Sequence, residues 1–134
     1  MGVFKNMEIA LGSKLDTISG KPAIHWENGQ VYIPVVGTRF WRPTNLPAGS
    51  QLMTASAVQK HIGIYQVDVF VPVEKGLSVL MADLDSIYSA YNTVLSLAGG
   101  SHNVDILGVG RGRVTREDAW LRGFISIEYM CYST

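Results

Sequence analysis

The stretch that decides the fold is Gly63-Ile64-Tyr65-Gln66-Val67-Asp68-Val69-Phe70-Val71-Pro72-Val73. Every odd-numbered position from Tyr65 to Val73 is apolar. An apolar residue at every second position is typical of a strand with one buried face. The even-numbered positions mix apolar and polar residues, namely Ile64, Gln66, Asp68 and Phe70. This half-apolar second face suits either a second layer of the fold or a neighbouring subunit.

Two amphipathic helices flank this strand in the sequence. Apolar residues recur at spacings of three and four over residues 4–18, which predicts a helix that ends at Gly20 and Pro22. The same periodicity predicts a longer helix over residues 77–97, terminated by Gly99-Gly100. Each helix has one apolar stripe, so we expect both to pack on the sheet.

The remaining extended segments predict four further strands. A short strand over residues 23–29 ends at an Asn-Gly turn signal, and a second covers residues 37–46, where Pro43 indicates an edge strand or a bulge. Residues 102–107 and 119–132 form the last two. The order is therefore α-β-β-β-α-β-β. It predicts an α+β fold in one domain, 1–134, with a mostly antiparallel β-sheet packed against two main helices.

A long, weakly patterned connection runs from Pro47 to about His61 and contains a single charge, Lys60. Connections of this length inside a compact domain are uncommon and often functional. We therefore expect a mobile loop or a long hairpin here, although an ordinary surface excursion is the alternative. The candidate interface residues are Leu52, Met53 and Lys60 from this segment and Phe70 from the central strand.

The composition is short of charge. Only 16% of the 134 residues are charged, against about 25% in an average domain. The 11 basic and 11 acidic side chains cancel to a formal net charge of zero. A neutral surface with few charges is poorly protected against association, so the chain is either a compact monomer or an assembly subunit. Zero net charge argues against general nucleic-acid binding through phosphate contacts.

The sequence also argues against membrane attachment and enzymatic chemistry. No apolar run approaches the ~20 residues that span a bilayer, and residues 1–8 show no signal-peptide pattern, so we expect neither membrane association nor secretion. The single cysteine, Cys131, excludes an intrachain disulfide. The three histidines lack metal-ligand spacing, so we expect no metal, no cofactor and no catalytic residues. A small hydrolase that uses His61 or His102 with a nearby acid is the alternative.

A glycine- and arginine-rich stretch over residues 108–116 is the clearest polar motif. It carries Arg111, Arg113 and Arg116, with Arg122 close behind. Arginines on a glycine-rich backbone suit contacts with the phosphates or carboxylates of a partner. In a ring such a patch would repeat around the axis as a positive collar lining the lumen. The alternative is a solvated turn paired with the neighbouring acids at positions 117 and 118.

Several of these segments together resemble a known family. They are Leu11-Gly12-Ser13-Lys14-Leu15 in the first helix, residues 22–28, residues 37–42, the central stretch 63–72, Lys75-Gly76, and Trp120 with residues 125–129. In element order the chain resembles, over nearly its whole length, the small tail terminator proteins of long-tailed bacteriophages, including the lambda-like tail terminators and related prophage proteins. The central stretch 63–72 is the most specific of the matching segments.

This resemblance implies a non-enzymatic virion protein. Such proteins form a homohexameric ring that caps the tail tube, stops its polymerisation and offers a surface to the head connector, and genomic DNA passes through the hole. The expected partners are therefore copies of the same chain, the tail tube protein and the connector. The expected place is the head-proximal end of the tail, after assembly in the host cytoplasm. A neck or tail-completion protein, which joins heads to tails, is the closest alternative.

Overall fold

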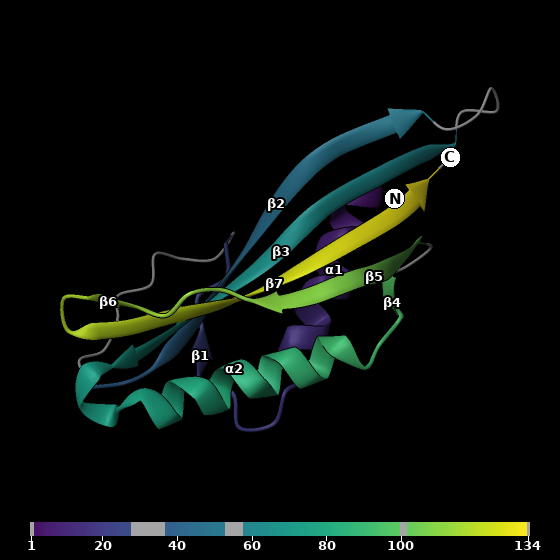
Figure 1. Ribbon diagram of the computed structural model, residues 1–134. Helices are drawn as coiled ribbons and strands as arrows, with labels where there is room; N and C mark the ends of the chain where they lie inside the picture. The colour runs from purple at the N-terminus through teal and green to yellow at the C-terminus, as the bar shows by residue number, and fades with distance from the viewer. Residues whose placement is uncertain (1, 28–36, 53–57, 100–101, 134) are drawn as a thin grey trace.

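The computed structural model describes residues 2–27, 37–52, 58–99 and 102–133, which form one curled sheet with helices on one face (Figure 1). The elements are α1 (Val3–Asp16), β1 (Ala23–Ile24), β2 (Phe40–Leu52), β3 (Gln59–Pro72), the 3-10 turn η1 (Val73–Lys75), α2 (Leu77–Asn92), β4 (Ser96–Gly99), β5 (His102–Arg111), β6 (Thr115–Glu117) and β7 (Trp120–Ser133). The predicted α+β class with a mostly antiparallel sheet is confirmed.

The sheet has seven strands in the order β1-β2-β3-β7-β5-β4, with β6 beside β7. Among the described strands, only the short β1–β2 pair is parallel. The predicted central strand, β3, pairs along its length with β2 on one side and β7 on the other, so that Val67 lies opposite both Pro43 and Ile125. Three long strands therefore form the middle of the sheet.

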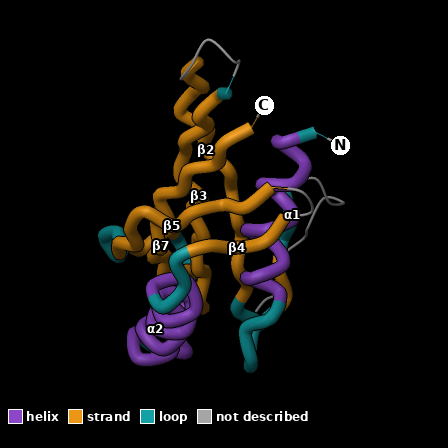
Figure 2. The backbone as a smooth tube through the Cα atoms, turned by 90° about the vertical axis from the view of Figure 1, so that its right-hand side faces the viewer, coloured by secondary structure: helices purple, strands orange, loops and turns teal. Residues whose placement is uncertain are grey.

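The hydrophobic core lies between the sheet and the two helices. The odd-numbered β3 residues from Tyr65 to Val71 are at most 2% exposed, as their alternation predicts. α1 contacts β4 and β5, and α2 contacts β3, β5 and β7 (Figure 2). The Tyr91 hydroxyl donates a 2.6 Å hydrogen bond to the Leu11 carbonyl, which joins the two helices inside the core.

The second helix is shorter than its periodicity predicts, which corrects the expected range. It ends at Asn92, and Ser96–Gly99 instead form β4, in which buried and exposed side chains alternate. Apolar Leu97 fits a helical repeat and a strand equally well, so the pattern alone misplaced the boundary. Gly99 does not terminate the helix. It packs against α1, where an added Cβ would overlap the carbonyl oxygen of Asn6.

Other boundaries also differ from the sequence prediction. The first strand is limited to Ala23–Ile24, and residues 28 and 29 of its expected range lie outside the described residues. Residues 108–111 extend β5, and the short strand β6 was not predicted. Pro43 does lie on a sheet edge, because β1 pairs only with Phe40 and Trp41, and a bulge follows between Pro47 and Gly49.

The long connection after Pro47 is an extension of the sheet. β2 continues to Leu52 and β3 begins at Gln59, with the two strands paired to their ends. The expectation of a long hairpin is therefore confirmed for the paired strands, while residues 53–57 of the connection lie outside the described part of the chain. Leu52 is 68% exposed and Lys60 is half-buried, whereas Met53 lies outside the described residues.

Candidate functional site

The face of the sheet that α1 and α2 leave uncovered carries the even-numbered residues of β3 and β7, and we call it the open face. At its centre the Asp68 carboxylate, only 3% exposed, accepts hydrogen bonds from Arg122 at 3.0 Å and Arg42 at 3.4 Å. The Gln66 side-chain amide donates a further bond to the same carboxylate at 3.1 Å. The buried charge is therefore neutralised by two arginines from the neighbouring strands.

An aromatic group adjoins this ionic cluster on the open face. Phe70 stacks on Phe40 with 4.7 Å between ring centroids, and the Arg42 and Arg122 guanidinium groups lie 4.9 and 5.9 Å from the centre of the Phe70 ring. Phe70 is consequently only 8% exposed. The predicted interface residue is buried inside its own chain, because the strand register places Phe40, Phe70 and Arg122 in one row.

Farther along the open face, apolar side chains remain in contact with solvent. Leu46 on β2 is 45% exposed and Tyr132 on β7 is 47% exposed, and Ile64 and Met130 are half-buried. Among the described residues no second layer covers this face. The second layer, one of the two expectations for the half-apolar face of β3, is therefore not found in the described part of the chain, and the neighbouring subunit stays a prediction.

The four arginines of the predicted patch do not share one surface. Arg122 lies on the open face, where it pairs with Asp68 and, at 3.5 Å, with Glu117. Arg111 lies opposite Ile125 on the helix-covered side, and its guanidinium donates to the Met81 sulfur at 3.2 Å. The structure thus brings Arg122 to the Asp68 cluster and separates it from Arg111.

Residues 111–122 run from the end of β5 through the hairpin of β6 and the start of β7, and we call this segment the arginine hairpin. Its exposed cations are Arg111, Arg113 and Arg116. Gly112 is not a flexible phosphate-binding position. Its N–H donates to the Phe124 carbonyl at 2.9 Å, and an added Cβ would overlap the Phe124 ring. The glycine is required for packing, and the arginines project from an ordered hairpin.

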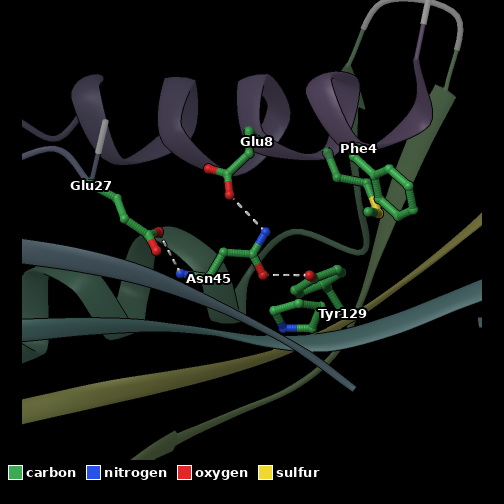
Figure 3. Close-up of a pocket in the computed structure, with 7 residues that line it drawn as sticks. Phe4, Glu8, Glu27, Asn45 and Tyr129 are labelled. Atoms are coloured by element: carbon green, nitrogen blue, oxygen red, sulfur yellow. Dashed lines mark hydrogen bonds between the residues drawn. The ribbon is translucent and has the colours of Figure 1, made fainter. Parts of the chain in front are cut away.

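A pocket of about 280 Å³ opens on the other side of the sheet, between α1, β2 and β7 (Figure 3). It is lined by Phe4, Met7, Glu8, Glu27, Asn45, Pro47 and Tyr129. Asn45 organises its polar groups: the side-chain amide donates to Glu8 at 2.8 Å, the backbone N–H donates to Glu27 at 3.0 Å, and the Tyr129 hydroxyl donates to the amide oxygen at 2.5 Å. We call this the acidic pocket.

The electrostatics of the acidic pocket favour a cation. Burial raises the pKa of the Tyr129 hydroxyl, and burial together with the charges of Glu8 and Glu27 raises the pKa of Tyr65 beneath it. Both hydroxyls therefore stay protonated at neutral pH. Neither glutamate has a Lys or Arg ion-pair partner among the residues that the structure describes. Sequence analysis missed this site because Glu8 and Asn45 are 37 residues apart and match no motif.

A family comparison identifies the chain. The family model described as phage tail terminator protein matches residues 6–129. The chain belongs to this family. The match extends from α1 into β7, so it includes the Asp68 cluster of the open face and most of the acidic pocket, whose Phe4 lies outside it. The recognition made from the sequence segments is therefore confirmed, and membership gives the protein a structural role as a component of a bacteriophage tail.

Structural comparison supports the fold of this tail terminator family member. One solved structure superposes with a TM-score of 0.80 over 97% of this chain and 96% of its own, at 20% sequence identity. That degree of identity shows a shared fold alone. A search of curated proteins found no match.

Between Pro43 and Pro47 the outer edge of β2 in this terminator-family chain offers no free backbone N–H to an added strand. The Trp41 carbonyl accepts a bond from His25 on β1, so the backbones of residues 41, 43, 45 and 47 face away from β3. Pro43 and Pro47 have no N–H, and the N–H of Asn45 is bonded to Glu27. Edge strands that offer no free donors resist pairing with another chain.

The histidines of the hydrolase alternative have structural partners. His61 is buried, and its ring nitrogens lie 2.6 Å from the Ser50 hydroxyl and 2.7 Å from that of Ser133, which ties β2, β3 and β7 together. A catalytic base is normally oriented by a third polar group, often a carboxylate, and here the second partner is another serine. His102 lies 2.7 Å from the Asn6 amide on α1.

The described residues hold no group of three or more His, Cys, Asp or Glu side chains arranged to bind a metal. Cys131 is buried, and burial raises the pKa of its thiol, which disfavours the reactive thiolate form. Within the described chain, no helix combines the length and apolarity required to cross a membrane.

Proposed function

We propose that this protein is the tail terminator of its phage: a homohexameric ring that caps the tail tube, stops its polymerisation and forms the interface to the head connector. The observation that carries the proposal is the family match over residues 6–129. In this assignment the protein performs no catalysis and sits at the head-proximal end of the tail, and DNA passes through the ring.

Three features of the chain support an assembled state. The open face keeps apolar side chains in solvent, including Leu46 and Tyr132. The hairpin of β2 and β3 extends beyond the core with Leu52 exposed near its end. The low charge content of 16% favours association over repulsion between copies.

Deleting the gene from the phage genome and measuring tails by electron microscopy tests this function. A terminator deletion gives overlong tails, because tube polymerisation no longer stops, and the wild-type gene supplied in trans restores normal length. Tails of normal length that fail to join heads would instead assign the protein to tail completion. Native mass spectrometry of the purified protein and of released rings tests the copy number of six.

A further inference from the structure

The arginine hairpin and the acidic pocket carry opposite charge and lie toward opposite ends of the sheet in one molecule (Figure 1). We propose that, in the ring, the arginine hairpin of each copy docks into the acidic pocket of the next copy. This inference rests on the proposed function. This contact would be head-to-tail, and a head-to-tail contact whose rotation closes generates a ring.

The hairpin side offers cations with no competing partner of opposite charge. Arg111, Arg113 and Arg116 are exposed, and none forms an ion pair among the described residues. Within the described ranges, the acceptor found for Arg111 is the Met81 sulfur, and the acceptor found for Arg116 is the Asp118 carbonyl at 3.5 Å. Among the described residues, Arg122 is the one arginine of the sequence motif that already forms ion pairs, with Asp68 and Glu117.

The pocket side offers the groups that a guanidinium recognises. Glu8 and Glu27 each use one carboxylate oxygen, Oε1, to bind Asn45. The side chain of Trp26, which is 36% exposed, packs on Gly12 beside the pocket. Carboxylates next to an exposed aromatic ring suit arginine. Its guanidinium donates paired hydrogen bonds to a carboxylate, and its flat face stacks on an aromatic ring.

The two surfaces cannot meet within one chain. Arg122, which lies opposite Thr115 of the hairpin, and Tyr129, which lines the pocket, are seven positions apart on β7. At ~3.3 Å per residue this separation is roughly 23 Å along the strand. Figure 1 shows the same arrangement, with β6 at one end of the sheet and α1 toward the other. A second copy must therefore supply the partner surface.

The alternative ring contact, pairing of strand edges, is disfavoured at β2. Its outward donors at positions 43, 45 and 47 are absent or bonded to Glu27. Under this proposal the arginines lie between subunits, which replaces the positive collar around the lumen that the sequence suggested. Because an exposed ion pair is screened by salt, the contact also predicts a ring that loosens as ionic strength rises.

Charge exchange between the two surfaces tests the contact. The variants are Arg113→Glu, Glu8→Arg and the double variant, and the control is Asp85→Arg, at an exposed carboxylate on α2. Arg113 lies outside any strand, so its reversal leaves the fold intact, which thermal melting by circular dichroism verifies. If Glu8→Arg melts early, Glu27→Arg replaces it. Each variant is assayed by native mass spectrometry and by tail length in the deleted phage.

We expect each single reversal to lower the ring fraction at least tenfold and to lengthen the tails. The double variant should restore the ring fraction to within about threefold of wild type, and the control should behave as wild type. A normal ring fraction and normal tail length in both single variants would overturn the contact and leave the ring function standing. A folded double variant whose ring fraction is not restored would do the same. A deletion that leaves tail length normal would instead overturn the terminator function itself.

Discussion

Asp68 is the residue whose replacement most directly tests the described packing of the open face. Its carboxylate is 3% exposed and neutralises Arg42 and Arg122, whose side chains are 42% and 29% exposed. The change Asp68→Asn keeps the shape of the side chain and removes its charge. The two guanidinium groups then lie beside each other and the Phe70 ring with no anion between them.

The size of the effect follows from burial. Removing one partner of a fully buried ion pair costs about 3–5 kcal/mol. Because both arginines are partly exposed and can be hydrated again, we expect the free energy of unfolding to fall by a smaller amount, about 2–3 kcal/mol. Unfolding entropy near 2.1 cal/mol/K per residue gives roughly 280 cal/mol/K for 134 residues, so Tm should fall by about 7–11 °C.

Thermal unfolding followed by circular dichroism measures this change. The matched control is Asp85→Asn, because Asp85 is exposed on α2 and should shift Tm by less than about 2 °C. Replacing Asp68 and both arginines together by apolar residues should recover part of the loss, since no buried unpaired charge then remains and Glu117, which loses Arg122, is exposed. A fall of less than about 3 °C in Asp68→Asn would refute the view that its carboxylate holds this face together.

Three further changes test other parts of the fold. Gly99→Ala should destabilise the protein by about 2–3 kcal/mol in urea denaturation, because the methyl group would push α1 off β4, and a loss below about 1 kcal/mol would contradict that packing. Burial raises the pKa of three tyrosines above the ordinary value of 10.0, so the unfolded chain loses their protons first. Their contribution to the free energy of unfolding is therefore fully present below about pH 10, and the free energy of unfolding falls above that pH by up to ~4 kcal/mol per pH unit. A Tm that stays constant to about pH 11 would argue against the burial of these hydroxyls. Pro43→Val restores an outward N–H on the β2 edge and should accelerate aggregation in light scattering, whereas an unchanged rate would show that the edge is protected by something else.

The sequence predicted the class of the fold because its strongest patterns are local. The alternation in β3 and the periodicity of α1 each place apolar side chains on one face, and the structure buries those faces. Prediction failed where a pattern fits two structures. The segment from residue 93 to 99 continues a helical repeat, but it leaves the helix because Leu97 pairs in register with Val104 of β5.

The candidate site depended on pairings that span the whole chain. The arginine cluster was visible in the sequence, and so was the hairpin after Pro47, because neighbouring residues form both. The sequence did not show that Arg122 would be separated from that cluster. This separation follows from the strand register, which places Arg122 beside Asp68, 54 residues earlier in the chain. The acidic pocket likewise exists only once α1 crosses β2.

For this tail terminator family member, the sequence alone determined the α+β class, the single buried face of β3 and the family. These depend on local periodicity and on segments that match in order. Only the tertiary structure decided which charges are neutralised and which remain available, because an ion pair needs two side chains within about 4 Å. Strand register and helix packing set that distance, so Asp68 pairs with two arginines, while Glu8 and Glu27 bind Asn45 and have no Lys or Arg partner among the described residues.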